Sequence, residues 1–116
     1  MKAEQDMTGD TSTIQEFVEE YFAAAIAHDQ ERYLALFSDD VIVHDDGRTH
    51  HGLAQVRAWH SEAPPVRYDL HEATGDPAAF LAAAEVSGDF PGSPIILRFS
   101  FQRNARGKIT SLGIEP

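Results

Sequence analysis

Asp45 is the side chain in this 116-residue sequence whose position best suits proton-transfer chemistry. It follows Val41-Ile42-Val43-His44, a run rich in β-branched residues that predicts a strand. Alternation along a strand places Asp45 on the same face as Val41 and Val43, so its carboxylate would enter an apolar interior. Loss of hydration there favours the protonated carboxyl, and such a group can hold or move a proton as a general base.

The residues after Asp45 offer a second interpretation. Asp46-Gly47 is a strong signal for a tight hairpin turn, with Arg48-Thr49-His50 returning beside the first strand. A two-residue turn pairs Asp45 directly with Arg48 on one face, which would make an ordinary cross-strand ion pair. The sequence leaves both interpretations open.

Tyr21 is the second candidate for chemistry. It belongs to a predicted amphipathic helix over residues 14–27, preceded by the capping pattern Thr13-x-x-Glu16. The apolar residues of that helix recur at alternating spacings of three and four, and they are Ile14, Phe17, Val18, Tyr21, Phe22 and Ala25. A buried phenol requires a polar partner, so Tyr21 is either a hydrogen-bonding group of a site or an ordinary core residue.

Other chemistries have little support. The sequence has no cysteine, which excludes disulfides, thiolate metal sites and a cysteine nucleophile. Four histidines, His44, His50, His51 and His60, are close in sequence, but they lack the helical spacing that brings two imidazoles to one ion. We therefore predict no metal and no cofactor.

The remaining elements must position these side chains. Residues 1–10 are polar and aperiodic, which predicts a disordered tail before a single domain over residues 11–116. Asp29 can cap a short second helix in which Tyr33, Leu34 and Phe37 point inward. A third helix carries Leu53, Val56, Trp59 and His60 on one face, and Pro64-Pro65 must end it.

After the prolines the pattern changes to strands, predicted over residues 66–74, 80–87, 95–102 and 108–115. The alanines of the second of these favour helix by propensity, but closely flanking turn signals favour a strand. Leu97, Phe99 and Phe101 share one face of the third, while Ile96, Arg98 and Ser100 face away. The order predicts an α+β domain with its helices on one side of a mostly antiparallel sheet.

Composition limits the partners. Nine basic and 19 acidic side chains give a formal charge of −10, which disfavours binding to nucleic acid or to an anionic membrane surface. The sequence contains no apolar run long enough to cross a membrane and no signal-peptide pattern at its start. We expect a soluble, cytoplasmic protein.

Several segments together resemble the SnoaL-like proteins of the nuclear transport factor 2-like superfamily, which includes ketosteroid isomerase, scytalone dehydratase and limonene epoxide hydrolase. The resemblance covers about residues 13–115. Its segments are Phe17-Val18-Glu19-Glu20-Tyr21-Phe22-Ala23-Ala24, Leu36-Phe37-Ser38-Asp39-Asp40-Val41-Ile42-Val43-His44-Asp45, Gly52 before a helix with Trp59, Gly88-Asp89-Phe90-Pro91-Gly92 and Arg106-Gly107-Lys108-Ile109.

The resemblance implies a cone-shaped α+β barrel in which a curved sheet and three helices enclose an apolar pocket for a hydrophobic small molecule. It also implies a homodimer formed through the outer face of the sheet. Asp45 corresponds to the proton-shuttling aspartate of ketosteroid isomerase and Tyr21 to the tyrosine that binds the substrate oxyanion. His60 corresponds to the tyrosine that supports Tyr21. The expected pocket wall is Phe37, Val43, Trp59, Val86, Leu97 and Phe99.

One part of the isomerase pattern is missing. The position of its protonated carboxylic acid falls here on Leu97 or Phe99, and neither side chain can donate a hydrogen bond. The epoxide hydrolase pattern would need a second aspartate beside Asp45 and Arg48, which we do not find. Isomerisation, cyclisation and dehydration by proton transfer therefore stay open. So does a non-catalytic module of the same fold that binds an apolar ligand or dimerises.

Overall fold

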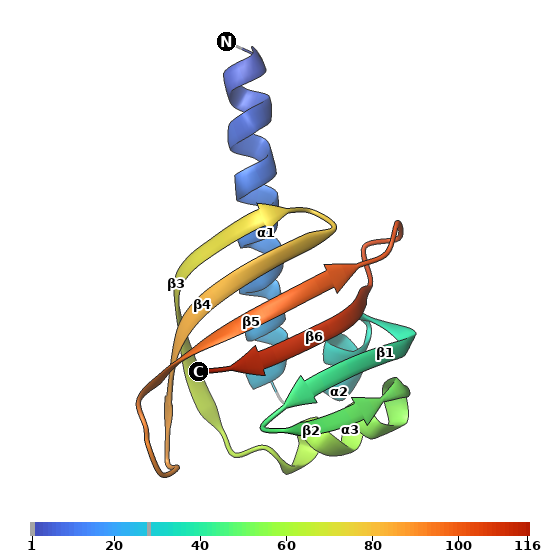
Figure 1. Cartoon of the computed structure of the whole chain (residues 1–116), viewed down its shortest axis with the longest axis vertical. Helices are drawn as coiled ribbons and strands as arrows, with labels where there is room; N and C mark the ends of the chain where they lie inside the picture. The colour runs from blue at the N-terminus through green and yellow to red at the C-terminus, as the bar shows by residue number, and fades with distance from the viewer. Residues whose placement is uncertain (1, 28) are drawn as a thin grey trace.

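The computed structural model describes the backbone of residues 2–27 and 29–116, and the side chains of residues 13–27 and 29–116. Two helices come first, a two-stranded hairpin and a third helix follow, and the remaining four strands come last (Figure 1). The helices are α1 (Lys2–Ile26), α2 (Gln30–Leu34) and α3 (Gly52–Glu62). The strands are β1 (Phe37–Asp45), β2 (Arg48–His51), β3 (Val66–Asp76), β4 (Ala79–Gly88), β5 (Ile95–Arg103) and β6 (Ile109–Glu115).

The strands form one curved sheet in the order β2-β1-β6-β5-β4-β3. The β1–β6 pair is parallel and the other four pairs are antiparallel, so the predicted α+β class and mostly antiparallel sheet are confirmed. Within the described residues the edge strands β2 and β3 do not pair with each other, so the sheet is an open cone and not a closed barrel.

The core lies between α1 and the concave face of the sheet. Ile14, Val18, Tyr21 and Phe22 of α1 are buried, as the spacing of apolar residues predicts. On β5 the alternation is also as predicted, because Phe99 and Phe101 are buried and Ile96, Arg98 and Ser100 are exposed. The backbone of α1 begins at Lys2, ahead of the start predicted at residue 14. The side chains of residues 1–12 lie outside the described part of the chain, and the predicted disorder of residues 1–10 stays a prediction. No helix in the described part of the chain is long and apolar enough to span a membrane.

The alanine-rich segment is the strand β4, as predicted. Ala82 and Ala84 are fully buried on the concave face, and β4 pairs with β3 on one side and β5 on the other. Backbone hydrogen bonding to a strand on each side outweighs the modest helical propensity of alanine.

Phe37 is buried as predicted, but its predicted place in the second helix is wrong. The short second helix ends at Leu34, and Phe37 begins β1, where it pairs with Ile109 of β6. The amide of Ile109 donates to the carbonyl of Leu36 over 2.8 Å, and Ser38 Oγ donates to the carbonyl of Ile109 over 3.0 Å. Pairing with a strand that lies some 70 residues later in the chain therefore decides this boundary, and local sequence patterns do not contain that information.

Gly75 is required at the end of β3. Its φ is +125°, and a Cβ there would lie 2.7 Å from both the carbonyl oxygen of Ala79 and the Cα of Phe80. Gly107 offers a matched control, because its φ is +80° but a Cβ would meet nothing within 4 Å. We expect Gly75→Ala to cost about 1–3 kcal/mol more stability than Gly107→Ala, since backbone atoms cannot move aside cheaply. Urea unfolding of the two variants measures the difference, and equal stabilities would contradict it.

Candidate active site

A cavity of about 350 Å³ opens between the ends of the three helices and the concave face of the sheet. All three tyrosines of the sequence and its single tryptophan line it, together with Asp45. Asp45 is the one lining side chain with a formal charge at neutral pH, and most of the others are apolar. The cavity thus combines an apolar wall with a single carboxylate and several phenols.

Asp45 is held in place by Trp59. It is partly buried at the end of β1, following the fully buried Val41 and Val43 on the same face, as predicted. The indole Nε1–H of Trp59, on α3, donates to Asp45 Oδ2 over 3.0 Å. Asp45 and Arg48 are opposed in the hairpin register, yet the ion pairs among the described residues do not include one between them. The ion-pair interpretation of Asp45 is therefore wrong, and its neighbour is an indole.

The polar partner that Tyr21 requires is Tyr33. The two hydroxyl oxygens lie 3.0 Å apart, both side chains are buried, and Tyr33 comes from α2. The side chain of Asp29 caps this short helix by accepting from the amide of Arg32, which positions Tyr33 one turn on. Sequence reasoning treated Tyr33 only as a core residue. The available signal was that a second buried phenol must also find a partner.

Burial keeps these phenols protonated. Loss of hydration raises the pKa of Tyr21 well above its ordinary value and raises the pKa of Tyr33 in the same direction. It also raises the pKa of Tyr68, on β3, to about 12. The negative charge of Asp45 adds a smaller contribution to the rise in all three pKa values. The tyrosines are therefore hydrogen-bond donors at neutral pH.

His60 lines the cavity, and its described contacts are with Tyr33, Ala25 and Gln30, so direct support of Tyr21 by His60 stays a prediction. Its ring stacks on Tyr33 with centroids 3.9 Å apart, and its Nε2 lies 2.9 Å from the carbonyl oxygen of Ala25. A carbonyl only accepts, so Nε2 carries a hydrogen. Nδ1 lies 3.2 Å from the Gln30 amide oxygen. The two ring nitrogens of His60 thus have neighbours on α1 and α2, and its ring packs against Tyr33, the partner of Tyr21.

Of the six side chains predicted to contact a substrate, Trp59 and Val86 line the cavity. Phe37, Val43 and Phe99 are buried in the core instead, and Leu97 is half-buried beside it. The predicted and observed cavity walls differ because alternation along a strand predicts which side chains are buried, but not whether a helix or the cavity lies above them. The cavity lies at the open end of the cone, beyond most of α1.

The four histidines considered for a metal do not converge. His44 Nδ1 lies 3.2 Å from the Thr49 hydroxyl, and the His50 ring stacks on Trp59. In the described part of the chain, the metal-ligating side chains that come together include none of these four.

The raised pKa values predict how stability depends on alkaline pH. Above pH 10, the ordinary tyrosine pKa, the unfolded chain releases phenol protons that the folded state retains. Stability is therefore fully present below that pH and falls as pH rises. We expect each retained proton to contribute a slope of roughly 1.4 kcal/mol per pH unit. Urea unfolding from about pH 9 to 11 measures this slope, and Tyr68→Phe should reduce it by one proton's share. A flat profile would contradict the burial of these phenols.

The chain matches the family model of the SnoaL-like domain over residues 18–112. Among solved structures it is similar to a candidate polyketide cyclase from Sinorhizobium meliloti, with 33% identity, 86% of this chain and 94% of that chain covered, and a TM-score of 0.79. A protein of ketosteroid isomerase-like fold from Catenulispora acidiphila, solved with trimethylamine, has 20% identity, 87% and 85% coverage, and a TM-score of 0.75.

A third similar structure comes from Mycobacterium tuberculosis and was solved with estradiol-17β-hemisuccinate. It has 21% identity, 89% of this chain and 92% of that chain covered, and a TM-score of 0.71. Likeness at this level of identity shows the fold. No curated protein matches the chain. The family match covers most of the sequence, and the fold agrees with it. The chain belongs to the SnoaL-like domain family.

Proposed function

We propose that this protein is a cofactor-independent enzyme of the isomerase or cyclase type that moves a proton on a hydrophobic, oxygen-containing small molecule. One observation carries the proposal. The Asp45 carboxylate and the Tyr21–Tyr33 phenol pair open onto the same apolar cavity. A base and a set of donors around one space can take a proton from carbon while stabilising the charge that develops on oxygen.

The reaction step balances with these groups alone. Asp45 takes a proton from a carbon beside a substrate carbonyl, and the electrons of that C–H bond move through the new C=C bond onto the carbonyl oxygen. A phenol O–H donates to this enolate oxygen. Return of the proton from Asp45 to another carbon of a conjugated enolate completes an isomerisation. In a cyclisation, the enolate carbon attacks a second carbonyl, and the proton on Asp45 passes to the alkoxide oxygen that forms there.

The hydrogen bonds around the site suit these roles. Trp59 donates to Asp45 Oδ2, and none of the described residues donates to Oδ1, so one oxygen can take the proton. Between Tyr21 and Tyr33 one hydroxyl donates to the other, which leaves one O–H to donate to the substrate. Asp45 and Ile114 also border a second, more open hollow at the β1–β2 turn, which gives the carboxyl a route to exchange its proton with solvent.

The lining favours the substrate class. A cavity of about 350 Å³ with mostly apolar walls is within the range of small-molecule pockets. The steroid derivative bound to the mycobacterial structure and the name of the Sinorhizobium protein support a hydrophobic, oxygenated ligand for a chain of this fold.

Deuterium exchange tests the proposal without knowledge of the natural substrate. A panel of cyclic and steroid ketones is incubated with the protein in heavy water, and exchange beside the carbonyl is followed by NMR. We expect exchange faster than in buffer for at least one hydrophobic ketone. Binding is followed separately by the fluorescence of Trp59, the only tryptophan, which lies in the cavity wall. Binding without exchange across the panel would overturn the enzyme proposal in favour of a ligand-binding module.

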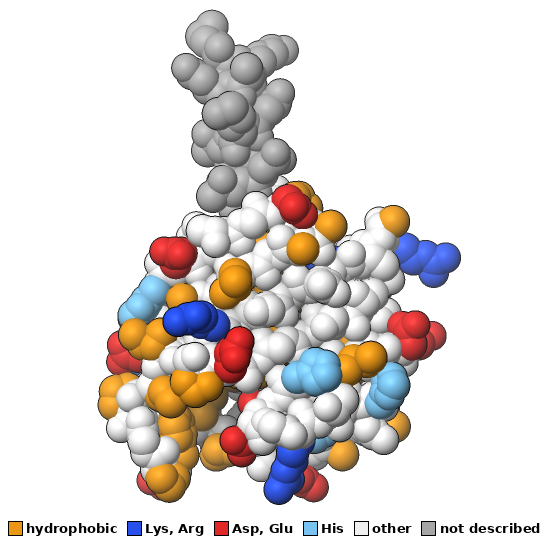
Figure 2. Space-filling view, viewed as in Figure 1, with side chains coloured by type: hydrophobic (Ala, Val, Ile, Leu, Met, Phe, Trp, Pro, Cys, Tyr) orange, Lys and Arg blue, Asp and Glu red, His pale blue; other side chains and the backbone are white. Residues whose placement is uncertain are grey.

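We also propose that the protein is a homodimer through the sheet face that turns away from α1. That face carries the exposed side chains of Leu81 and Ile96, which are 42% and 52% accessible. Figure 2 shows hydrophobic side chains among charged ones on this side. Sedimentation at tens of micromolar should give a dimer, in the range where interfaces of standard size hold. Ile96→Glu should weaken it, whereas Ala105→Glu in the exposed β5–β6 turn should not. A monomeric wild-type protein would contradict the proposal.

A further inference from the structure

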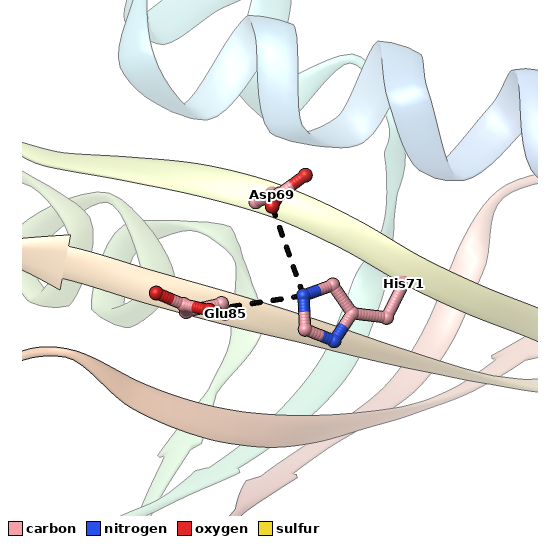
Figure 3. Close-up of side chains that lie close together, drawn as sticks. All are labelled: Asp69, His71 and Glu85. Atoms are coloured by element: carbon pink, nitrogen blue, oxygen red, sulfur yellow. Dashed lines mark ion pairs between the residues drawn. The ribbon is translucent and has the colours of Figure 1, made fainter.

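Three side chains with metal-ligating atoms meet on the outer face of the sheet, away from the cavity. They are Asp69 and His71 on β3 and Glu85 on β4 (Figure 3). His71 Nε2 lies 3.7 Å from Asp69 Oδ2 and 3.8 Å from Glu85 Oε1. Figure 3 shows both carboxylates directed toward this same nitrogen.

Strand register and a β-bulge bring them together. Asp69 is directly opposite Glu85 in the β3–β4 pair. Leu70 pairs with Ala84 and Glu72 with Ala83, so His71 is the extra residue of a bulge between them. The bulge leaves His71 and Glu72 both exposed, which interrupts the alternation of this strand. Bulges commonly re-aim a side chain in this way.

The two carboxylates of the cluster require a positive charge between them. Two carboxylates directly opposite each other across a pair of strands repel. If His71 is neutral with its hydrogen on Nδ1, the lone pair of Nε2 points between the two carboxylates and can coordinate a cation there. Arg67 and Arg98 lie on neighbouring positions of this face, but the ion pairs among the described residues join neither of them to Asp69 or Glu85. The charge of the two carboxylates is therefore balanced here either by a protonated His71, which lies within ion-pair distance of both, or by a bound cation that a neutral His71 would help to hold.

We propose that Asp69, His71 and Glu85 bind a first-row divalent transition ion, with Zn²⁺ as the test ion. One imidazole nitrogen and two carboxylate oxygens are ligands that Zn²⁺ accepts in proteins, and three protein ligands leave a coordination position open for water. Mg²⁺ and Ca²⁺ prefer more oxygen ligands and do not favour imidazole. The proposal is independent of the proton-transfer function, because none of these residues lines the cavity.

The spacing fits after small side-chain adjustments. The three ligand atoms lie within 4.8 Å of one another, whereas a tetrahedral Zn²⁺ with bonds of about 2.1 Å needs them roughly 3.4 Å apart. His71 and Glu85 have 40% of their side-chain surface exposed and Asp69 has 79%, so the side chains can rotate to close the difference.

Calorimetric titration of the tag-free protein with zinc chloride tests the site, and native mass spectrometry counts the ions per chain. We expect one Zn²⁺ per chain and no binding of Mg²⁺ at the same concentrations. His71→Gln and Glu85→Gln should each weaken Zn²⁺ binding by at least about tenfold. The matched control is His51→Gln, an exposed histidine on β2 outside the cluster, which should bind as the wild type does.

His71→Gln and Glu85→Gln each change a different ligand, so one variant still tests the site if the other folds poorly. Thermal melts show whether each variant is folded. Absence of Zn²⁺ binding to the wild type would overturn the proposal. It would also be overturned if affinity were unchanged in both His71→Gln and Glu85→Gln, or if His51→Gln lost as much affinity as they do. The dimer is proposed through the same face, and Glu85 is directly opposite Ile96 in the β4–β5 pair, so the titration is made at a protein concentration whose oligomeric state sedimentation has established. Because the ketone exchange assay does not involve this face, the Zn²⁺ proposal and the proton-transfer proposal can each fail while the other stands.

Discussion

Asp45→Asn is expected to slow deuterium exchange on a bound ketone by about 10²–10⁴-fold, the usual contribution of a general base. An amide cannot take the proton, but its oxygen can still accept from Trp59 Nε1, so the fold and the cavity should persist. Binding measured through Trp59 should therefore remain while exchange is lost.

Asp46→Asn is the matched control for this variant. It makes the same chemical change one residue later, at an exposed turn position whose φ of 54° asparagine tolerates well. Its exchange rate should equal that of the wild type. If Asp45→Asn retained full exchange activity, or if both variants lost it equally, Asp45 would not be the base.

Tyr21→Phe and Tyr33→Phe are each expected to slow exchange by about 10²–10³-fold, the typical cost of removing one donor to a developing oxyanion. Each substitution breaks the 3.0 Å contact between the two hydroxyls and leaves the remaining phenol without its partner in a buried site. The double variant should be little slower than the slower single variant, because two groups that act as a unit are not additive.

Tyr68→Phe provides the comparison. Tyr68 lines the same cavity and stacks on Phe22 with centroids 4.4 Å apart, but it is not part of the phenol pair. We expect the deuterium exchange rate of this variant to fall less than tenfold, because the substitution removes no more than one weak contact to the substrate. Multiplicative losses in the Tyr21/Tyr33 double variant, or a loss in Tyr68→Phe equal to theirs, would show that the pair is not the donor.

Along β1, the sequence predicts the strand face and the pairing register, but not the side-chain contacts. Alternation alone placed Asp45 beside Val41 and Val43, and the dipeptide Asp46-Gly47 predicted its register with Arg48; both are confirmed. The side-chain partner of Asp45 could not be predicted in this way. An ion pair would need the side chains of Asp45 and Arg48 to point toward each other. The Asp45 carboxylate instead accepts a hydrogen bond from the Trp59 indole on α3. That contact depends on how α3 packs against the sheet, which local sequence patterns do not describe.

The helices show the same division. The spacing of apolar residues in α1 was sufficient to predict that Tyr21 is buried, because burial of one helical face follows from periodicity. Its partner Tyr33 is 12 residues away on a separate helix, and the angle between α1 and α2 brings the hydroxyls together. His60 likewise lies on the predicted face of α3, but that packing aims its nitrogens at Ala25 and Gln30.

Composition and periodicity by themselves determined the class of this protein: a chain with net charge −10, three helices with a small hairpin before the main run of strands, and a carboxylate at the end of a buried strand face. Only the tertiary structure decided which side chains touch. It placed Phe37 in a strand through pairing with Ile109, and it joined Asp69, His71 and Glu85 through a bulge and a cross-strand register. The physical reason is that burial depends on local periodicity, whereas contacts depend on the relative placement of elements distant in the chain.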